Sequence, residues 1–456
     1  MLKVRFRKTI SLFLSLFMAF SFIFPITALA ITFEPNIQLH AKGVYMVNLD
    51  TGQVVFEKNK NEKIYPASLT KIMTAILAIE NIDDLSTEIT YKNYIQDIMS
   101  NLNAQYGGIS LGGLLAGERL SAEKLLYATL LPSANEAATM LADYVGDGSI
   151  SAFCEMMNKK AKEIGANDTN FVNPHGLHDE QQYTTPYDMA LITQYALKNE
   201  TFRKICETNF YDGSPTNMHE SQLYWNTTNL LSVQRSEYYC AGVTGIKTGT
   251  LAESGRHVIS TGKRGGYEYL LVVMGAPFAD ADGKQIPVNN AFVDAKALYN
   301  WAFETFTNKT VIEKGSVYNE VPVKMSADKA NPYIKLRATK DFIALIPRDI
   351  DVSSIQLKYN LPETVDAPIK EGDVVGSVDL VLKDEVMGSV DLEASRDVDR
   401  SLVLFVINTI KNLLTSFWFK FIFIFAIILI LSYIGLAMLR YYNHKKYRQV
   451  KRHRKL

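Results

Sequence analysis

The stretch PASLTKIMTA, residues 66–75, places Lys71 three positions after Ser68 at the start of an apolar run. Residues i and i+3 share one face of a helix, so these two side chains are expected to lie together. The apolar residues that follow recur at helical spacing and predict a core-facing stripe: Ile72, Met73, Ile76 and Leu77. A lysine beside this stripe is either a solvated helix residue or a partly buried base for Ser68, because burial lowers the pKa of an ammonium.

Ser-x-x-Lys alone is weak evidence for a reactive serine, because the pattern occurs at four places in this chain. The pairs are Ser68/Lys71, Ser121/Lys124, Ser260/Lys263 and Ser326/Lys329. Only the first pair stands where an apolar helix begins. Ser121 is predicted to be a helix N-cap with Lys124 facing solvent, and the last two pairs fall on strand or turn patterns.

Two further motifs occur once each. LPSANEAA, residues 131–138, contains Ser133-Ala134-Asn135, and a loop is expected there because the residue before a proline avoids the helical conformation. GVTGIKTGTLAESG, residues 242–255, contains Lys247-Thr248-Gly249 on a predicted strand edge. A glycine there leaves room for a ligand, so the neighbouring lysine and threonine can bind and orient a carboxylate.

The three motifs, in this order on helix, loop and strand, resemble those of the active-serine penicillin-binding proteins and serine β-lactamases. The surrounding sequence is similar to the low-molecular-mass D-alanyl-D-alanine carboxypeptidases of peptidase family S11, from about residue 38 to residue 305. The similar segments are YPASLTKIMTA (65–75), GERLSAEKLLYATLLPSANEAATMLADYV (117–145), NDTNFVNPHGLHDEQQYTTPYDMALI (167–192) and GIKTGTLAESGRHVISTGKRGGYEYLLVVMGA (245–276).

The resemblance implies a specific role for each catalytic residue. Ser68 is expected to be the acyl-forming nucleophile, with Lys71 as its base in acylation. Ser133 is expected to pass a proton to or from the leaving group, together with Lys247. No cofactor and no metal is expected.

The resemblance also implies a substrate-binding set: Asn135, Lys247, Thr248, Gly249 and Thr250. In that set Asn135 holds the substrate amide, while Lys247 and Thr248 bind the terminal carboxylate. The backbone N–H groups of Ser68 and Thr250 form the oxyanion hole. The position after Lys-Thr-Gly varies in the family, so Thr250 contributes only its backbone.

Two other functions stay open at this point. A class A β-lactamase carries a Glu-x-x-x-Asn segment about 35 residues after Ser-x-Asn for deacylation, but NDTNFVNPHG, residues 167–176, has no glutamate there. A non-catalytic wall-binding protein is the other alternative, against which the three intact motifs argue. The experiment that separates these functions is labelling by a penicillin together with D-alanine release.

Other patterns are interpreted as structural. Residues 108–112, GISLG, match the elbow of α/β-hydrolases, but the preceding residues are polar and do not form the required strand. His175 and His178 are predicted to be structural residues of a turn, since no third metal ligand is near in sequence. Three aspartates without metal-loop spacing are expected to be solvated: Asp143, Asp147 and Asp168.

The order of patterns predicts one α/β (α+β) domain of the serine β-lactamase/transpeptidase-like class, with an antiparallel sheet and an inserted helical part. Strand patterns are expected at 43–59, 243–249 and 256–275, and the first and the last of these are predicted to be hairpins, the last with Gly265-Gly266 at its turn. Helical patterns are expected at 121–145 with a break at 131–133, at 151–165, at 185–208 and at 289–306. A small all-β domain follows, of which APIKEGDVVG is the segment most similar to the C-terminal domain of the family.

Both ends of the chain predict export and membrane attachment. The first residues combine a basic start, an apolar run and Ala28-Leu29-Ala30, which is typical of a cleaved signal peptide. Residues 421–439 carry no charge, and only basic charges follow, so a membrane crossing with a cytoplasmic tail is expected. An uncleaved N-terminal anchor stays an alternative. The family resemblance implies only an amphipathic anchor helix, so the crossing and its tail depart from the family pattern.

The expected domain limits are a signal peptide at 1–30, a catalytic domain at 31–308, a β-rich domain at 309–398, an amphipathic juxtamembrane segment at 399–420, a transmembrane helix at 421–439 and a basic tail at 440–456. The juxtamembrane segment is interpreted as an interfacial helix or a stalk.

The zero net charge hides an asymmetry along the chain. All 48 acidic residues lie between residues 31 and 400. Because four basic residues precede that part and ten follow it, it holds 34 basic residues and a net charge near −14. Binding of nucleic acid by this part is therefore not expected, and the basic tail is expected to contact anionic lipid heads instead. The three cysteines do not predict a disulfide framework, although one pair is possible: Cys154, Cys206 and Cys240.

These observations together predict an exported, membrane-anchored serine carboxypeptidase. Its expected substrates are peptidoglycan stem peptides that end in D-Ala-D-Ala, and β-lactams are expected to acylate the same serine, Ser68. The sequence leaves open the oligomeric state, the ligand of the β-rich domain, and any accompanying endopeptidase or transpeptidase activity.

Overall fold

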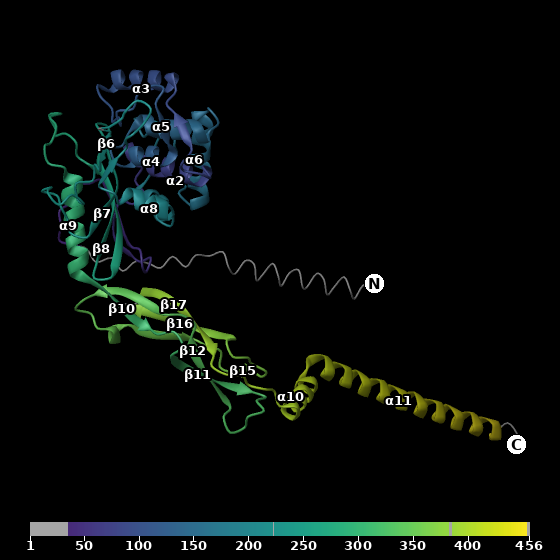
Figure 1. Cartoon of the computed structure of the whole chain (residues 1–456). Helices are drawn as coiled ribbons and strands as arrows, with labels where there is room; N and C mark the ends of the chain where they lie inside the picture. Colours follow the sequence, from purple (N-terminus) through teal and green to yellow (C-terminus); the bar gives the residue numbers. More distant parts are fainter. Residues whose placement is uncertain (1–34, 222, 383–384, 454–456) are drawn as a thin grey trace. The chain divides into compact units, whose positions relative to one another are not determined.

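The computed structural model of the chain describes residues 35–221, 223–382 and 385–453 (Figure 1). The predicted signal peptide lies outside these residues. The contacts divide the chain into two units, which are described separately. The first unit contains the residues up to Thr310 with Ile343–Ile355 and Leu382–Met387, and the second contains Val311–Phe342, Gln356–Val381 and the residues from Gly388 onward.

A five-stranded sheet in the order β2-β1-β9-β8-β7 forms the centre of the first unit. Its strands are β1 (Gly43–Asn48), β2 (Val54–Lys58), β7 (Val243–Leu251), β8 (Gly255–Arg264) and β9 (Tyr267–Ala276). All neighbours pair antiparallel, and the two predicted hairpins join β1 to β2 and β8 to β9. Gly265 and Gly266 both have positive φ in the second hairpin turn, as expected where a two-residue turn follows the strand twist. The predicted antiparallel sheet is therefore confirmed.

Both faces of this sheet are buried. Successive side chains of β9 point to opposite faces, as strand geometry requires, and enter two different hydrophobic clusters. Those on the side of the helical part are Leu270, Val272 and Met274. Those on the side of α9 (Asn290–Thr305) are Tyr269, Leu271 and Val273. Figure 1 shows α9 along one face of the sheet, with the helical part on the other.

The helical part of the first unit consists of α2 (Lys71–Asn81), α3 (Asn93–Tyr106), α4 (Ala122–Leu130), α5 (Asn135–Val145), α6 (Ile150–Ile164), α7 (Pro186–Ala196) and α8 (Glu200–Cys206). Two short sheets accompany these helices, β3 (Glu88–Thr90) with β4 (Arg119–Ser121) and β5 (Phe210–Asp212) with β6 (Tyr224–Asn226). The predicted break at residues 131–133 lies between α4 and α5. Pro186 occupies the first turn of α7, where its missing N–H group costs no helical hydrogen bond.

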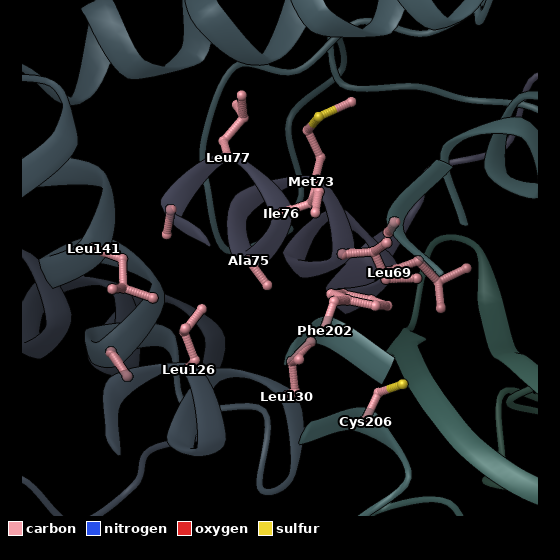
Figure 2. Packing of buried hydrophobic residues seen from close by; sticks show 14 of the residues in the cluster. Leu69, Met73, Ala75, Ile76, Leu77, Leu126, Leu130, Leu141, Phe202 and Cys206 are labelled. Atoms are coloured by element: carbon pink, nitrogen blue, oxygen red, sulfur yellow. The ribbon is translucent and has the colours of Figure 1, made fainter. Parts of the chain in front are cut away.

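The helix α2 runs through the middle of the helical part. Every residue from Lys71 to Ala78 is buried, because other helices surround it on several sides. Figure 2 shows apolar side chains from these helices around α2, among them Leu126, Leu130, Leu141 and Phe202. The prediction of a single core-facing stripe is therefore too narrow, since a helix that is apolar on all sides belongs in a core.

The second unit is built around a six-stranded sheet in the order β14-β16-β17-β12-β11-β15. Its strands are β11 (Val317–Lys324), β12 (Tyr333–Ala338), β14 (Gln356–Asn360), β15 (Val365–Asp366), β16 (Val374–Leu382) and β17 (Glu385–Ala394). A separate two-stranded sheet pairs β10 (Phe306–Ile312) with β13 (Phe342–Pro347), and most residues of these two strands belong to the first unit. The predicted small all-β part is confirmed.

Two helices follow the second sheet, α10 (Leu402–Thr415) and α11 (Phe417–His453). Residues Phe417–Asn443 are long and apolar enough to cross a membrane and are not buried in the protein. This segment contains the predicted crossing and fits membrane anchoring of the chain. The juxtamembrane segment is helical, with Ser401 as its N-cap.

The structure answers the question about the cysteines. Cys154, Cys206 and Cys240 are all buried and unpaired. The first unit is therefore held together by its hydrophobic core and hydrogen bonds, without a disulfide among these residues.

Candidate active site

Ser68 lies in a tight turn that the surrounding chain holds in an unusual shape. The turn is a 3-10 helix, Ala67–Thr70, and the α-helix begins only at Lys71, so Ser68 precedes α2 instead of lying in its first turn. Ala67 has φ of +50°, a conformation that is strained for a residue other than glycine. Such strain needs support, and the Thr70 hydroxyl supplies part of it by donating a hydrogen bond of 2.9 Å to the Ala67 carbonyl.

Two glycines let the backbone pack closely around this turn. A Cβ atom on Gly176, which has φ of +88°, would lie 1.9 Å from the Ala67 carbonyl oxygen. A Cβ atom on Gly249 of strand β7 would lie 3.0 Å from the Ala67 Cβ atom. The loop that contains Gly176 and the strand that contains Gly249 therefore border the Ser68 turn.

Lys71 is fully buried, and its ammonium nitrogen has three hydrogen-bond partners. The Nζ atom lies 2.9 Å from the Ser68 Oγ atom, 2.7 Å from the Asn135 Oδ1 atom and 2.7 Å from the His175 carbonyl oxygen. Burial, and next the nearby Lys247 ammonium, hold the pKa of Lys71 well below its ordinary value. Of the two interpretations of the opening stretch, the solvated lysine is therefore wrong.

Ser133 and Asn135 come from the loop before α5 and from the first residue of that helix. Ser133 has φ of +67° and is 4% exposed. Its Oγ atom has no hydrogen-bond partner among the described residues, which is uncommon for a buried hydroxyl. The Asn135 N–H group donates a hydrogen bond of 3.0 Å to the Ser110 carbonyl, which fixes the start of the helix. The loop before α5 thus holds a buried hydroxyl that has no hydrogen-bond partner among the described residues.

Lys247, Thr248, Gly249 and Thr250 lie in succession on β7, which packs beside the Ser68 turn. Lys247 is 1% exposed, and burial lowers its pKa to about 7. Its ammonium donates a hydrogen bond of 3.1 Å to the Thr248 carbonyl, while the Thr248 hydroxyl donates one of 2.6 Å to the Thr228 hydroxyl. Thr250 is exposed. The strand therefore presents a buried cation and a hydroxyl in the order that the sequence predicts.

Comparison with known proteins places this geometry in a family. Residues 30–278, more than half of the chain, match the family described as D-alanyl-D-alanine carboxypeptidase, peptidase S11. The chain belongs to this family. Residues 306–400 match the C-terminal domain of penicillin-binding protein 5.

Individual relatives agree with the family. The chain is 28% identical to D-alanyl-D-alanine carboxypeptidase DacF of Bacillus subtilis (strain 168), over 84% of this chain and 90% of the relative. It is 30% identical to D-alanyl-D-alanine carboxypeptidase DacC of Escherichia coli (strain K12), over 80% and 86%. The solved structure of penicillin binding protein 5 from Haemophilus influenzae matches this chain with a TM-score of 0.63 at 24% identity. The match covers 81% of this chain and 100% of the chain in that structure, so the two share a fold. The family and its relatives together support a serine-type D-alanyl-D-alanine carboxypeptidase.

Two groups of this carboxypeptidase site are absent from the sequence prediction. The first is the carbonyl of His175, which accepts a hydrogen bond from Lys71. Burial, and next the Lys71 charge, lower the pKa of the His175 imidazole to about 3, so the ring is neutral. The second is Glu136, which follows Asn135 and is 1% exposed. An acidic residue in the first turn of a helix was the available signal for Glu136, because the helix dipole favours it there.

The structure also shows where the residues lie that the sequence analysis interpreted as structural. Ser121 caps α4, with its Oγ atom accepting a hydrogen bond of 3.2 Å from the Lys124 N–H group. Ser110 lies in the loop after α3, without the strand that a hydrolase elbow needs. No group of three or more His, Cys, Asp and Glu side chains among the described residues is arranged to hold a metal ion.

One of these predictions is wrong. Asp143 is 1% exposed, and its carboxylate lies 2.6 Å from the Lys92 ammonium and accepts a hydrogen bond from Tyr94. The sequence pattern missed this burial because Lys92 and Tyr94, its partners, lie about fifty residues away in sequence.

A cavity of about 290 Å³ opens in the first unit, and the predicted site residues do not line it. Its lining combines residues before the Ser68 turn with residues of two later loops: Lys42, Glu62, Lys63, Ile64, Tyr65, Glu180, Tyr183, Glu253 and Ser254. The site described above is therefore a packed set of polar groups around Ser68, with this cavity as a separate feature.

Replacing Gly176 with alanine is expected to displace the Ser68 turn, because the new Cβ atom would overlap the Ala67 carbonyl oxygen. We expect a loss of about 1–3 kcal/mol in the free energy of unfolding and a loss of about 10²-fold in the rate of acylation by a penicillin. The matched control is Gly266→Ala, at φ of +91° with no atom within 4 Å of the new Cβ. Thermal melting and acylation rates are measured for both variants. Equal losses in the two variants would contradict the prediction, because they would show that strain at positive φ, and not overlap with Ala67, causes the loss at Gly176.

Proposed function

We propose that Ser68 is the nucleophile of this carboxypeptidase and that Lys71 is its base. The observation that carries the proposal is the 2.9 Å contact between the Nζ atom of fully buried Lys71 and the Oγ atom of partly exposed Ser68. When Lys71 is neutral, its two N–H bonds can donate to Asn135 Oδ1 and to the His175 carbonyl, and its lone pair then faces the Ser68 hydroxyl. These contacts therefore support a neutral amine that accepts a proton from Ser68.

The chemistry follows from this arrangement. Ser68 Oγ attacks the carbonyl carbon between the two terminal D-alanines while its proton moves to Lys71. The Ser133 hydroxyl, which has no hydrogen-bond partner among the described residues, relays the proton from Lys71 to the amine of the departing D-alanine, so both residues return to their starting protonation states. Water then attacks the acyl-enzyme and releases the shortened peptide. No cofactor enters these steps.

The remaining predicted residues bind the substrate. Lys247 and Thr248 bind the terminal carboxylate, for which a buried cation beside a hydroxyl is suited. Asn135 holds the substrate amide, and the backbone N–H groups of Ser68 and Thr250 hold the carbonyl oxygen as it becomes negative. β-Lactams present a carbonyl and a carboxylate in the same way, so they acylate Ser68 and stay bound.

The setting of this activity is also part of the proposal. The signal peptide is removed after Ala30, and the helix at 421–439 crosses the membrane once with the basic tail in the cytoplasm. The catalytic domain at 31–308 and the β-rich domain at 309–398 then lie outside the cytoplasm, where peptidoglycan stem peptides are found. The long apolar helix supports the membrane crossing in this proposal.

The test uses the full chain in detergent with a fluorescent penicillin and with a pentapeptide that ends in D-Ala-D-Ala. Long-lived labelling together with release of D-alanine supports the proposed function. Rapid turnover of the penicillin would indicate a β-lactamase instead. Absence of both labelling and D-alanine release would contradict the enzymatic function.

A further inference from the structure

Glu136 is a buried carboxylate at the edge of the proposed active site. It is 1% exposed and directly follows Asn135, which accepts a hydrogen bond from Lys71. Its Oε1 atom accepts a hydrogen bond of 2.5 Å from the Gly112 N–H group. Its Oε2 atom has no hydrogen-bond partner among the described residues. A carboxylate with one oxygen left unpartnered in a core is costly, which calls for a role beyond packing.

The hydrogen bond to Gly112 fastens a loop to α5. The Gly112 carbonyl accepts a hydrogen bond of 2.9 Å from the Trp225 indole, and the Ser110 carbonyl accepts one from the Asn135 N–H group. This part of the chain leaves little room, since a Cβ atom on Gly112 would lie 3.4 Å from Glu136 Oε1. Glu136 therefore connects the loop at 110–112 with the end of α5 that carries Asn135.

Glu136 also acts on Lys71 by its charge. The three hydrogen-bond partners of Lys71 do not include Glu136, so the two charges interact through space. Burial raises the pKa of Glu136 to about 7, and the Glu136 carboxylate raises the pKa of Lys71 against the larger effects of burial and of Lys247. After burial, the Glu136 charge raises the pKa of Tyr91, and the Lys71 charge lowers the pKa of His175.

We propose that Glu136 is a positioning residue whose charge raises the pH at which Lys71 becomes the neutral base, while its hydrogen bond to Gly112 holds the neighbouring loop against the site. This inference rests on the proposed role of Lys71. An ionised Glu136 raises the pH at which Lys71 loses its proton, and a neutral side chain at position 136 lowers that pH.

The direction of the effect can be worked out. Acylation requires neutral Lys71, so the acylation rate increases as the pH passes through the pKa of Lys71. This part of the pH–rate profile is called the rising limb. Glu136→Gln removes the negative charge that favours the ammonium, so the pKa of Lys71 falls and the rising limb moves to lower pH. Glutamine keeps an oxygen that can accept the hydrogen bond from Gly112. We expect a displacement of the rising limb on the order of one pH unit.

The experiment measures the second-order rate constant of acylation of the full chain by a fluorescent penicillin, from about pH 5 to about pH 10. The matched control is Glu118→Gln, because Glu118 is also fully buried and accepts a hydrogen bond of 2.8 Å from the Leu115 N–H group of the same loop. We expect Glu118→Gln to lower the melting temperature and to leave the rising limb in place. A rising limb of Glu136→Gln that coincides with that of the wild type would overturn the proposal.

A second variant keeps the proposal testable if Glu136→Gln does not fold. Glu136→Asp keeps the charge but draws the carboxylate away from Gly112, so we expect a lower melting temperature with the limb near its wild-type position. A limb moved by a full pH unit toward acid in Glu136→Asp would overturn the proposal. Absence of labelling of the wild type at every pH would instead contradict the proposed function, which separates the two failures.

Discussion

Replacing Lys71 with methionine is expected to lower the rate of acylation by a penicillin by about 10³–10⁴-fold. Among the described residues, the Lys71 amine is the only basic group in hydrogen-bond contact with Ser68 Oγ, and its pKa is lowered from the ordinary value of lysine. Its loss therefore leaves the serine without a base. Methionine fills a similar volume and brings no buried charge, so the fold is expected to persist. Stopped-flow labelling measures the rate, and a thermal melt checks the fold.

The matched control for this prediction is Lys124→Met. Lys124 also stands three residues after a serine in this chain, but its ammonium donates to the Pro215 carbonyl at the surface. We expect wild-type acylation from this control. A Lys71→Met variant that keeps more than about a tenth of the wild-type rate would exclude Lys71 as the base.

The second large effect is expected for Ser68→Ala, which should form no covalent adduct with any penicillin. Release of D-alanine should fall to the uncatalysed background, because the acyl-enzyme needs the Ser68 oxygen. Ser121→Ala is the control, and it is expected to lose about 1 kcal/mol of stability as a missing N-cap while keeping full activity. Adduct formation in Ser68→Ala would place the nucleophile elsewhere.

Most of the fold that could be predicted from the sequence was predicted from local patterns. Pro132 follows the end of α4, and the predicted loop stands there because proline restricts the residue before it. Alternating apolar residues predict the hairpins of the sheet because strand side chains repeat with a period of two. Ser68, Lys71 and Asn135 are brought together in space, although the roles assigned to them stay proposals.

Features that depend on tertiary packing escaped prediction. The His175 carbonyl binds Lys71 through the backbone, and every residue has a carbonyl, so no side-chain pattern marks it. Helix α2 is buried around Lys71 because several helices surround it, which the period of its own sequence does not show. Asp143 is buried because Lys92 and Tyr94 approach it from a distant part of the chain.

Burial explains the protonation states of the His175 ring and of the two lysines at the site. Burial, and next the Lys71 charge, lower the pKa of His175, so this histidine stays neutral. The same burial lowers the pKa of both lysines. The two proposed roles, a base for Lys71 and a carboxylate-binding cation for Lys247, thus fall to the same residue type.

Peptide mapping by mass spectrometry after brief exposure of the full chain to a penicillin tests the central claim most directly. We predict that the whole adduct lies on the peptide that contains Ser68 and that it persists during the analysis. A prior incubation with a D-Ala-D-Ala pentapeptide should slow its formation, since both compounds react with the same oxygen. An adduct on any other residue, or consumption of the penicillin without an adduct on Ser68, would contradict the account.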